Sequence, residues 1–236
     1  MQLISSLPSR LVEWYRQESV TTNYDIFSRL PALAYFGFVI SVQSSVVADA
    51  VMVEHGLTPG LRIATIIARA AALMVVVLFA ALTLIRSKPV ARSKRLEPRI
   101  VAIVGVVVLF GLIFLERGET IMVWEVTSAL LIAASGILTS VVLLWLGRSF
   151  STMPGARRLV TSGPYRYLRH PLYLTEEIAV IGVLLQYRSP AAFALVALQM
   201  ALQVRRMLCE EQVLGETFPE YEQYCANTPR LVPGVF

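Results

Sequence analysis

The chain has 236 residues, of which 56% are hydrophobic and only 16% are charged, and its mean hydropathy is +0.64. A soluble domain of this size cannot bury so much apolar surface, so the composition excludes an ordinary soluble protein and favours a polytopic membrane protein. The formal net charge of +5 does not indicate a nucleic-acid partner, because the excess lies in short loops between apolar segments. Two histidines and two cysteines are too few and too scattered for a structural metal site or a disulfide framework.

The first thirty residues differ from the rest of the chain, because they contain no uninterrupted apolar run of the signal-peptide type. Leu11, Trp14 and Tyr15 are suited to a short helix that rests among lipid headgroups. We therefore predict an interfacial segment over residues 1–30.

Six apolar stretches come after residue 30, and we interpret each as a membrane helix because a hydrocarbon core of ~30 Å requires ~20 helical residues. The last two are joined only by the sequence Arg-Ser-Pro, which predicts a tight helical hairpin. The expected fold is therefore all-α, a polytopic integral membrane protein with N-terminal transmembrane helices over 31–146 and a region that carries the polar motifs over 147–236. The six predicted helices cover Pro31–Val53, Ile63–Ile85, Ile100–Leu115, Met122–Leu146, Leu172–Tyr187 and Ala191–Leu208.

Basic residues concentrate in two of the connecting loops. Loop 86–99 holds six, and loop 148–169 holds five and no acidic residue, whereas each loop on the opposite side holds one. Since basic loops stay on the cytoplasmic side, both termini, these two loops and the polar C-terminal tail are expected to face the cytosol. A role as topology signals is sufficient to explain loop 86–99. The basic residues are Arg86, Lys88, Arg92, Lys94, Arg95 and Arg99 in the first loop and Arg148, Arg157, Arg158, Arg166 and Arg169 in the second.

The stretch GPYRYLRHPLYLTEE, residues 163–177, places arginines, tyrosines and a histidine at the start of the fifth apolar segment. Pro164 and Pro171 disfavour a helical conformation in the residues before them, so we expect His170 at the entrance of the fifth helix and not within it. Free amides at a helix N-terminus suit a carboxylate or another anionic group. The alternative is a headgroup anchor, which is common at membrane interfaces.

A second polar group follows the sixth apolar segment. Arg206 and Glu210 are four residues apart, so they share a helix face and can pair. Because helices five and six form a hairpin, the start of one and the end of the other must lie side by side. Inward-facing ionisable groups at a membrane helix end are functional candidates. The predicted pocket combines His170, Tyr173 and Glu176 with Arg206, Glu210 and Glu211.

These motifs resemble those of integral membrane methyltransferases. The sequence RHPLY, a hydrophobic hairpin, and then Glu210, Glu211 and Leu214 are similar to the isoprenylcysteine carboxyl methyltransferase and phospholipid methyltransferase superfamily. The resemblance covers residues 145–236 and implies a cytosolic S-adenosylmethionine site with a lipophilic acceptor arriving from the bilayer. It implies Arg206, Glu210 and Glu211 as catalytic candidates. The implied cofactor-binding residues are Arg169, His170, Pro171, Tyr173, Glu176, Glu210, Leu214, Tyr221 and Tyr224, of which the last two could also simply pack at the membrane interface.

The chemistry of this cofactor agrees with the motifs. Its carboxylate, ammonium, sulfonium and adenine groups need cations or amide donors, carboxylates and aromatic walls, all of which the motifs supply. Methyl transfer is an in-line displacement that depends mainly on alignment and on the exclusion of water. A carboxylate acceptor needs no general base, whereas an amine or a hydroxyl must lose a proton to a glutamate or to His170.

The sequence also bears on the kind of acceptor and on two alternative functions. Isoprenylcysteine enzymes carry an arginine on the helix before the long loop, but segment Met122–Leu146 has no basic residue, so we expect a lipid or isoprenoid-tailed head of another kind. A membrane sterol-type reductase that uses NADPH has a similar C-terminal half, although RHPLY together with the acidic pair favours a methyltransferase. A non-enzymatic transport or assembly protein would need polar groups near the bilayer midplane, which segments three, five and six lack below their ends. We expect membrane lipids as surroundings and a bacterial inner membrane as location, with neither nucleic acid nor metal bound; the oligomeric state stays open.

Overall fold

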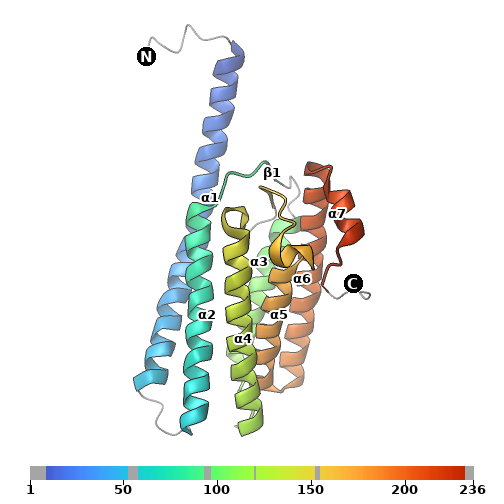
Figure 1. Cartoon of the computed structure of the whole chain (residues 1–236). Coiled ribbons are helices and arrows are strands. Elements are labelled where there is room, and N and C mark those ends of the chain that lie inside the picture. Colours follow the sequence, from blue (N-terminus) through green and yellow to red (C-terminus); the bar gives the residue numbers. More distant parts are fainter. Residues whose placement is uncertain (1–8, 53–57, 93–96, 120, 152–154, 232–236) are drawn as a thin grey trace.

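The computed structural model describes residues 9–52, 58–92, 97–119, 121–151 and 155–231, apart from the side chains of residues 9–26, 28, 92, 99 and 106. This part of the chain is almost entirely helical (Figure 1). The helices are α1 (Ser9–Met52), α2 (Pro59–Ile85), α3 (Glu97–Phe110), α4 (Met122–Leu146), α5 (Pro171–Tyr187), α6 (Pro190–Thr217) and α7 (Tyr221–Asn227); the strands are β1 (Ala91–Arg92) and β2 (Gly155–Ala156), and 3₁₀ turns cover Gly111–Phe114, Gly147–Ser149 and Gly163–Arg166.

Four helical stretches in the described part of the chain are long and apolar enough to cross a membrane. The apolar helix over Ile100–Phe114 is shorter, and α5 has 17 residues. At ~1.5 Å per residue, α5 reaches about 25 Å, less than a hydrocarbon core of ~30 Å. The chain is thus a helical protein of the integral membrane type, and the count of six spans stays a prediction. The four stretches are Arg29–Met52, Pro59–Ile85, Met122–Ser149 and Pro190–Thr217.

Helix α1 is continuous through Pro31, although the sequence predicted a boundary at residue 30. Proline has a backbone φ compatible with a helix, so it can remain inside one when the neighbouring groups tolerate the lost hydrogen bond. The N-terminal part of α1 extends beyond the ends of the other helices (Figure 1). The side chains of Leu11, Trp14 and Tyr15 lie outside the described residues, so their contact with headgroups stays a prediction.

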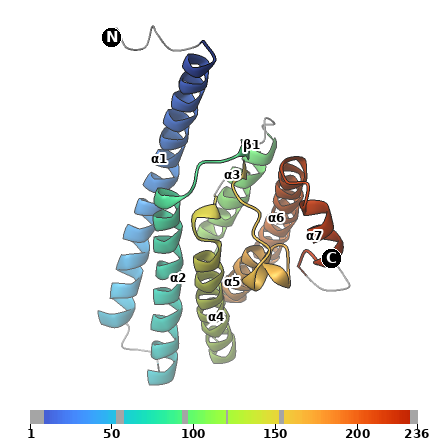
Figure 2. The same ribbon diagram turned by 45° about the horizontal axis from the view of Figure 1, so that its top comes forward.

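The helices pack side by side in a bundle. Helices α1 and α2 lie side by side, α4 packs between α2 and α5, and α3 packs against α6 (Figure 2). Arginines join α1 to α2 at both ends of the pair by donating to helix C-terminal carbonyls, which lack donors of their own. Arg29 donates to Leu84 at 2.5 Å and to Arg86 at 3.2 Å, and Arg62 donates to Val51 at 2.5 Å.

Helix α4 contacts its neighbours through small and hydroxyl-bearing residues. Gly136 lies directly against Ala71 of α2, and on the other side Ser135 donates to the Thr175 carbonyl at 2.6 Å. The Thr139 hydroxyl donates to the Thr175 hydroxyl at 2.8 Å. Between apolar helices in lipid, close packing of small residues and interhelical hydrogen bonds supply most of the association energy. These contacts fix α5, and therefore its N-terminus, against α4.

The two basic loops pair with each other at the end of the bundle where α7 also lies (Figure 1). Strands β1 and β2 are antiparallel, with Ala91 opposite Ala156. Arg157 donates through Nε to the Ser87 carbonyl at 2.8 Å. Gly163 has a positive φ of 59° and lies against the ring of Trp145, where a larger residue would collide. The long loop before α5 is thus tied both to loop 86–92 and to α4.

Replacing Gly136 by alanine should destabilise the protein. An added Cβ would lie 2.7 Å from the Ala71 Cβ and 3.0 Å from its carbonyl carbon, so α2 and α4 would have to separate. Overpacking of this kind costs ~1–3 kcal/mol, which exceeds the ~0.5–1 kcal/mol that alanine otherwise adds in a helix. The measurement is thermal unfolding in detergent, with Gly37→Ala as control, because nothing lies within 4 Å of a Cβ there. Equal unfolding temperatures for the two variants would show that the α2–α4 contact is not tight.

Candidate active site

A tight hairpin brings the start of α5 beside the end of α6. Helix α5 ends at Tyr187 and α6 begins at Pro190, so only two residues form the turn. Arg188 adopts a left-handed conformation with φ 43°, and the Ser189 hydroxyl caps α6 by accepting from the Ala192 amide at 3.2 Å. The predicted hairpin is confirmed.

His170 lies at the entrance of α5, as predicted. Its backbone, with φ −129° and ψ 55°, is not helical, and Pro171 occupies the first helical position. The amides of Arg169 and His170 donate to the carbonyls of Pro229 at 2.8 Å and Arg230 at 3.1 Å. The C-terminal tail therefore runs along the entrance of α5 and holds it in place.

The Glu211 carboxylate accepts hydrogen bonds from three basic side chains. Arg169 Nη1 lies 2.9 Å and His170 Nε2 3.0 Å from Oε1. Arg230 Nε lies 3.1 Å from Oε1 and 3.0 Å from Oε2. The Glu211 side chain is only 10% exposed and does not line the cavity that opens beside Glu210. This geometry gives Glu211 a positioning role, since it joins α6, the α5 entrance and the tail.

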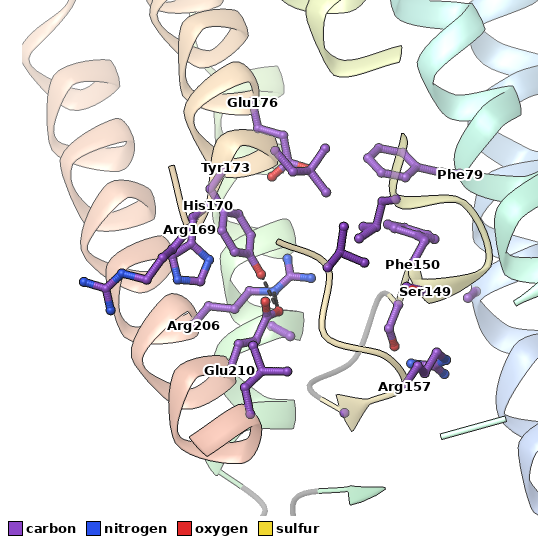
Figure 3. Close-up of a pocket in the computed structure, with 18 of the residues that line it drawn as sticks. Phe79, Ser149, Phe150, Arg157, Arg169, His170, Tyr173, Glu176, Arg206 and Glu210 are labelled. Carbon is purple, nitrogen blue, oxygen red and sulfur yellow. Dashed lines mark hydrogen bonds and ion pairs between the residues drawn. The ribbon is translucent and has the colours of Figure 1, made fainter. Parts of the chain in front are cut away.

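Glu210, the neighbour of Glu211, points in a different direction and belongs to a second set of contacts. The Tyr173 hydroxyl donates to its Oε1, and Arg206 Nε lies 3.6 Å from the same oxygen, which confirms the predicted pairing across one helical turn. The Arg206 guanidinium also lies 5.2 Å from the centre of the Tyr173 ring, within range of a cation–π contact. A carboxylate, a guanidinium and a phenol thus meet at one point (Figure 3).

A cavity of about 670 Å³ opens beside this group and has two unlike walls. Its polar wall comes from α5, α6 and the segments next to them. Its apolar wall comes from α1, α2, α3 and the segment after α4, and includes the stacked rings of Phe36, Phe79 and Phe150, with centroids 5.8 Å and 5.2 Å apart. Figure 3 shows Phe79 and Phe150 across the cavity from Tyr173 and Glu176. Of the predicted site residues, Arg169, His170, Tyr173, Glu176, Arg206, Glu210, Leu214, Tyr221 and Tyr224 line it, whereas Pro171 and Glu211 do not.

Two tyrosines at the cavity have a raised pKa and keep their hydroxyl protons. The Tyr224 hydroxyl donates to the Tyr165 carbonyl at 2.6 Å, and burial raises the pKa of Tyr224 to about 12. Burial, and next to it the charge of Glu210, raises the pKa of Tyr165. Contact with the loop before α5 therefore holds Tyr224 at the cavity.

Two glutamines of α6 were not among the predicted site residues. Gln203 donates to Glu176 Oε2 at 2.8 Å, and Gln199 donates to Glu177 Oε1 at 3.1 Å. Gln199 and Glu177 are buried inside the hairpin, so the expectation that segments five and six lack polar groups below their ends was wrong. The signal was available, because glutamines four residues apart inside an apolar stretch share one helix face.

A second cavity, of about 370 Å³, continues from the first between α3 and the α5–α6 hairpin. Gln199 and Gln203 line it, opposite apolar residues of α3. Both cavities share the side chains of Tyr35, Ala102, Phe110, Glu176 and Arg206.

The donor set of the main cavity fits the cofactor that the motifs imply. Arg169 Nε is buried at the cavity and has no hydrogen-bond partner among the described residues, so it can receive an anionic group. Glu210 supplies a carboxylate, and the tyrosines supply aromatic surface. Within the described ranges, no three His, Cys, Asp or Glu side chains are grouped so that they could hold a metal ion.

Comparison with known proteins supports a membrane methyltransferase at the level of the family. Residues 123–221 match the phospholipid methyltransferase family, in agreement with the resemblance that the motifs indicated. The chain is 38% identical over 76 residues to the cobalt-zinc-cadmium resistance protein CzcN of Cupriavidus metallidurans, and 36% identical over 76 residues to the nickel-cobalt-cadmium resistance protein NccN of Alcaligenes xylosoxydans xylosoxydans. Each match covers 32% of this chain and only about a third of the relative, 35% and 36% respectively.

Replacing Glu211 by glutamine should loosen the tail from the entrance of α5. A hydrogen bond to a charged group is worth ~1.5–3 kcal/mol, and this side chain makes several of them. We expect a lower unfolding temperature and faster amide hydrogen exchange at Arg169 and His170, whose amides bind the tail. Glu216→Gln is the matched control, because Glu216 accepts an exposed hydrogen bond from Gln212 of the same helix and lies outside the contacts that hold the tail. Unchanged exchange in the Glu211 variant would remove the positioning role.

Proposed function

We propose that the protein is an S-adenosylmethionine-dependent methyltransferase that acts on a lipophilic acceptor at the cytosolic face of the membrane. The observation that carries the proposal is one cavity with a polar wall built from the family's motif residues and an apolar wall built from membrane helices. Its volume, about 670 Å³, lies in the range of ~300–1,000 Å³ typical of cofactor and small-molecule sites.

The polar wall would hold the cofactor. Arg169, with an unused donor, and the non-helical backbone at His170 suit its carboxylate, and Glu210 suits its ammonium or sulfonium charge. When bound, S-adenosylmethionine supplies a methyl group on a positively charged sulfur. The residues of this chain then orient the reactants and exclude water, which are the main contributions to an in-line displacement.

The apolar wall would hold the tail of the acceptor. Ile103 and Val107 of α3 line the cavity and are themselves more than half exposed, so apolar surface is continuous from the cavity to the outside of the bundle. In a membrane that outside surface meets lipid, and an acceptor that stays partly in the bilayer can reach the cavity without crossing water. Membrane lipids are accordingly the proposed surroundings and source of the acceptor.

The proposed cytosolic orientation of the cavity follows from the position of the two basic loops. The paired basic loops and α7 lie at the same end of the bundle as the polar wall of the cavity (Figure 1). Arg157 and Arg158 of the second basic loop line the cavity as well. Since short basic loops are retained in the cytosol, we propose that this end is cytosolic and that the protein lies in a bacterial inner membrane.

Glu210→Gln should weaken S-adenosylmethionine binding roughly tenfold to a hundredfold, because a charge-assisted contact worth ~1.5–3 kcal/mol is lost. Tyr173→Phe, which removes the hydroxyl that orients Glu210, should weaken binding less. Affinities are measured by calorimetry on purified protein in detergent, with NADPH as a second ligand. Thr127→Ala is the control, because that hydroxyl bonds the Val123 carbonyl of its own helix away from the cavity. Binding of NADPH in place of S-adenosylmethionine would replace the proposed function by a reductase.

Turnover should depend strongly on the length of the acceptor's tail. Each buried methylene contributes ~0.8 kcal/mol, so removal of four carbons should lower kcat/KM by about two orders of magnitude. The assay follows radiolabelled methyl transfer into a membrane lipid extract and then into tailed and tail-free forms of each product found. Equal turnover of the two forms would contradict an acceptor that arrives from the bilayer.

A further inference from the structure

Glu176 lies at the junction of the two cavities. Its side chain lines the main cavity on one side and the second cavity on the other, in the second turn of α5 and three residues beyond Tyr173. Figure 3 shows it on the polar wall, facing the space across which Phe79 and Phe150 lie. A group in this place borders both the main cavity, with its polar wall, and the second cavity along α3.

Four side chains near the cavity could in principle receive a proton, and three of them are engaged elsewhere. Glu210 is bound by the Tyr173 hydroxyl and lies 3.6 Å from Arg206, and Glu211 is bound by three basic side chains outside the cavity lining. The His170 ring is tied to Glu211 at 3.0 Å. A general base needs a lone pair that faces the acceptor, and Glu176 meets this condition best.

The Glu176 carboxylate accepts a hydrogen bond from a neutral side chain, while the charge of Arg206 acts on it from α6. Gln203, a neutral amide, donates to Oε2 at 2.8 Å and orients the carboxylate. Glu177 provides an internal contrast. It is held in the same manner by Gln199 at 3.1 Å, yet it is buried and lines neither cavity.

We propose that Glu176 faces the methyl-accepting atom and takes its proton, so that the acceptor head is an amine or a hydroxyl and not a carboxylate. This inference rests on the proposed methyltransferase function. The acceptor's lone pair forms the new bond to the methyl carbon while the carbon–sulfur bond breaks with both electrons going to sulfur. The proton of the acceptor passes to the Glu176 carboxylate and from there to water. An acceptor carboxylate in the same place would be repelled by the like charge.

Other ionisable groups face Glu176 and set the background for a pH measurement. Arg206 and Glu210 approach from α6, and Glu177 is its neighbour on α5. The phenols of Tyr173, Tyr165 and, across the junction, Tyr35 complete the set. Glu176→Gln removes one of these groups and leaves the others in place.

The test compares Glu176→Gln with Glu177→Gln and Glu176→Asp in detergent-purified protein. The acceptor probes are phosphatidylethanolamine for an amine, a long-chain polyprenol for a hydroxyl and N-acetyl-S-farnesylcysteine for a carboxylate. In the unmodified protein we expect methyl transfer to an amine or hydroxyl probe that declines as the pH falls. Glu176→Gln should reduce it at least a hundredfold and abolish the decline for the hydroxyl probe, whereas protonation of the amine itself keeps a decline for the amine probe in every variant. Glu177→Gln should stay within threefold, and Glu176→Asp should keep a residual, pH-dependent rate.

Two binding measurements distinguish the role of Glu176 from the proposed methyltransferase function. In Glu176→Gln, binding of the amine or hydroxyl probe to cofactor-free protein should weaken about tenfold, and by a larger factor than S-adenosylmethionine affinity, because the carboxylate is assigned to the acceptor. Methyl transfer only to the farnesylcysteine carboxylate, or an unchanged rate in Glu176→Gln, would overturn the assignment of Glu176 while leaving a methyltransferase. Failure of the unmodified protein to bind S-adenosylmethionine would overturn both.

Discussion

The convergence of three basic side chains on Glu211 is the interaction on which the site depends. It joins segments that are far apart in sequence: the α5 entrance through Arg169 and His170, α6 through Glu211 itself, and the tail through Arg230. Partly buried ion pairs add little stability relative to apolar packing, but removal of one partner leaves charges uncompensated and is strongly destabilising. The contact therefore specifies one arrangement of the tail. That arrangement places Tyr221 and Tyr224 at the cavity.

In both α5 and α6, two consecutive glutamates make different contacts. Neighbouring residues on a helix point about 100° apart, so two consecutive side chains cannot face the same space. In α6, Glu210 lines the cavity and Glu211 binds the tail. In α5, Glu176 lines the cavity and Glu177 is held by Gln199 inside the hairpin. Each pair combines a group available to ligands with a group that fixes the helix, which explains why these positions carry two carboxylates in a row.

Much of the polar wall could be predicted from the sequence because it depends on local rules. Proline set the conformation of His170, helical spacing paired Arg206 with Glu210, and the short turn brought both ends of the hairpin together. The apolar wall could not be predicted, since Phe36 and Phe79 reach the cavity only through the packing of α1 and α2 against distant segments. Helix ends were predicted only in part: α5 ends at Tyr187 as predicted, whereas α6 continues to Thr217, nine residues past the predicted Leu208. Both gaps concern tertiary arrangement.

The polar residues of α6 form a stripe whose chemistry changes with depth. Gln199, Gln203, Arg206 and Glu210 are spaced by four, three and four residues, so they lie on one face over about 16 Å of helix. The two ionisable groups, Arg206 and Glu210, lie nearer the C-terminal end of the helix, and the two neutral amides lie nearer its middle. Burying a charge toward the centre of a bilayer costs far more free energy than burying an amide. An order with the amides deeper than the charged groups is therefore favoured. Glu176, bound to the amide of Gln203, lies where the charged part of the stripe gives way to the neutral part. The proposed acceptor would then place its reacting head at Glu176, where the ionisable partners end, and its tail among the apolar helices.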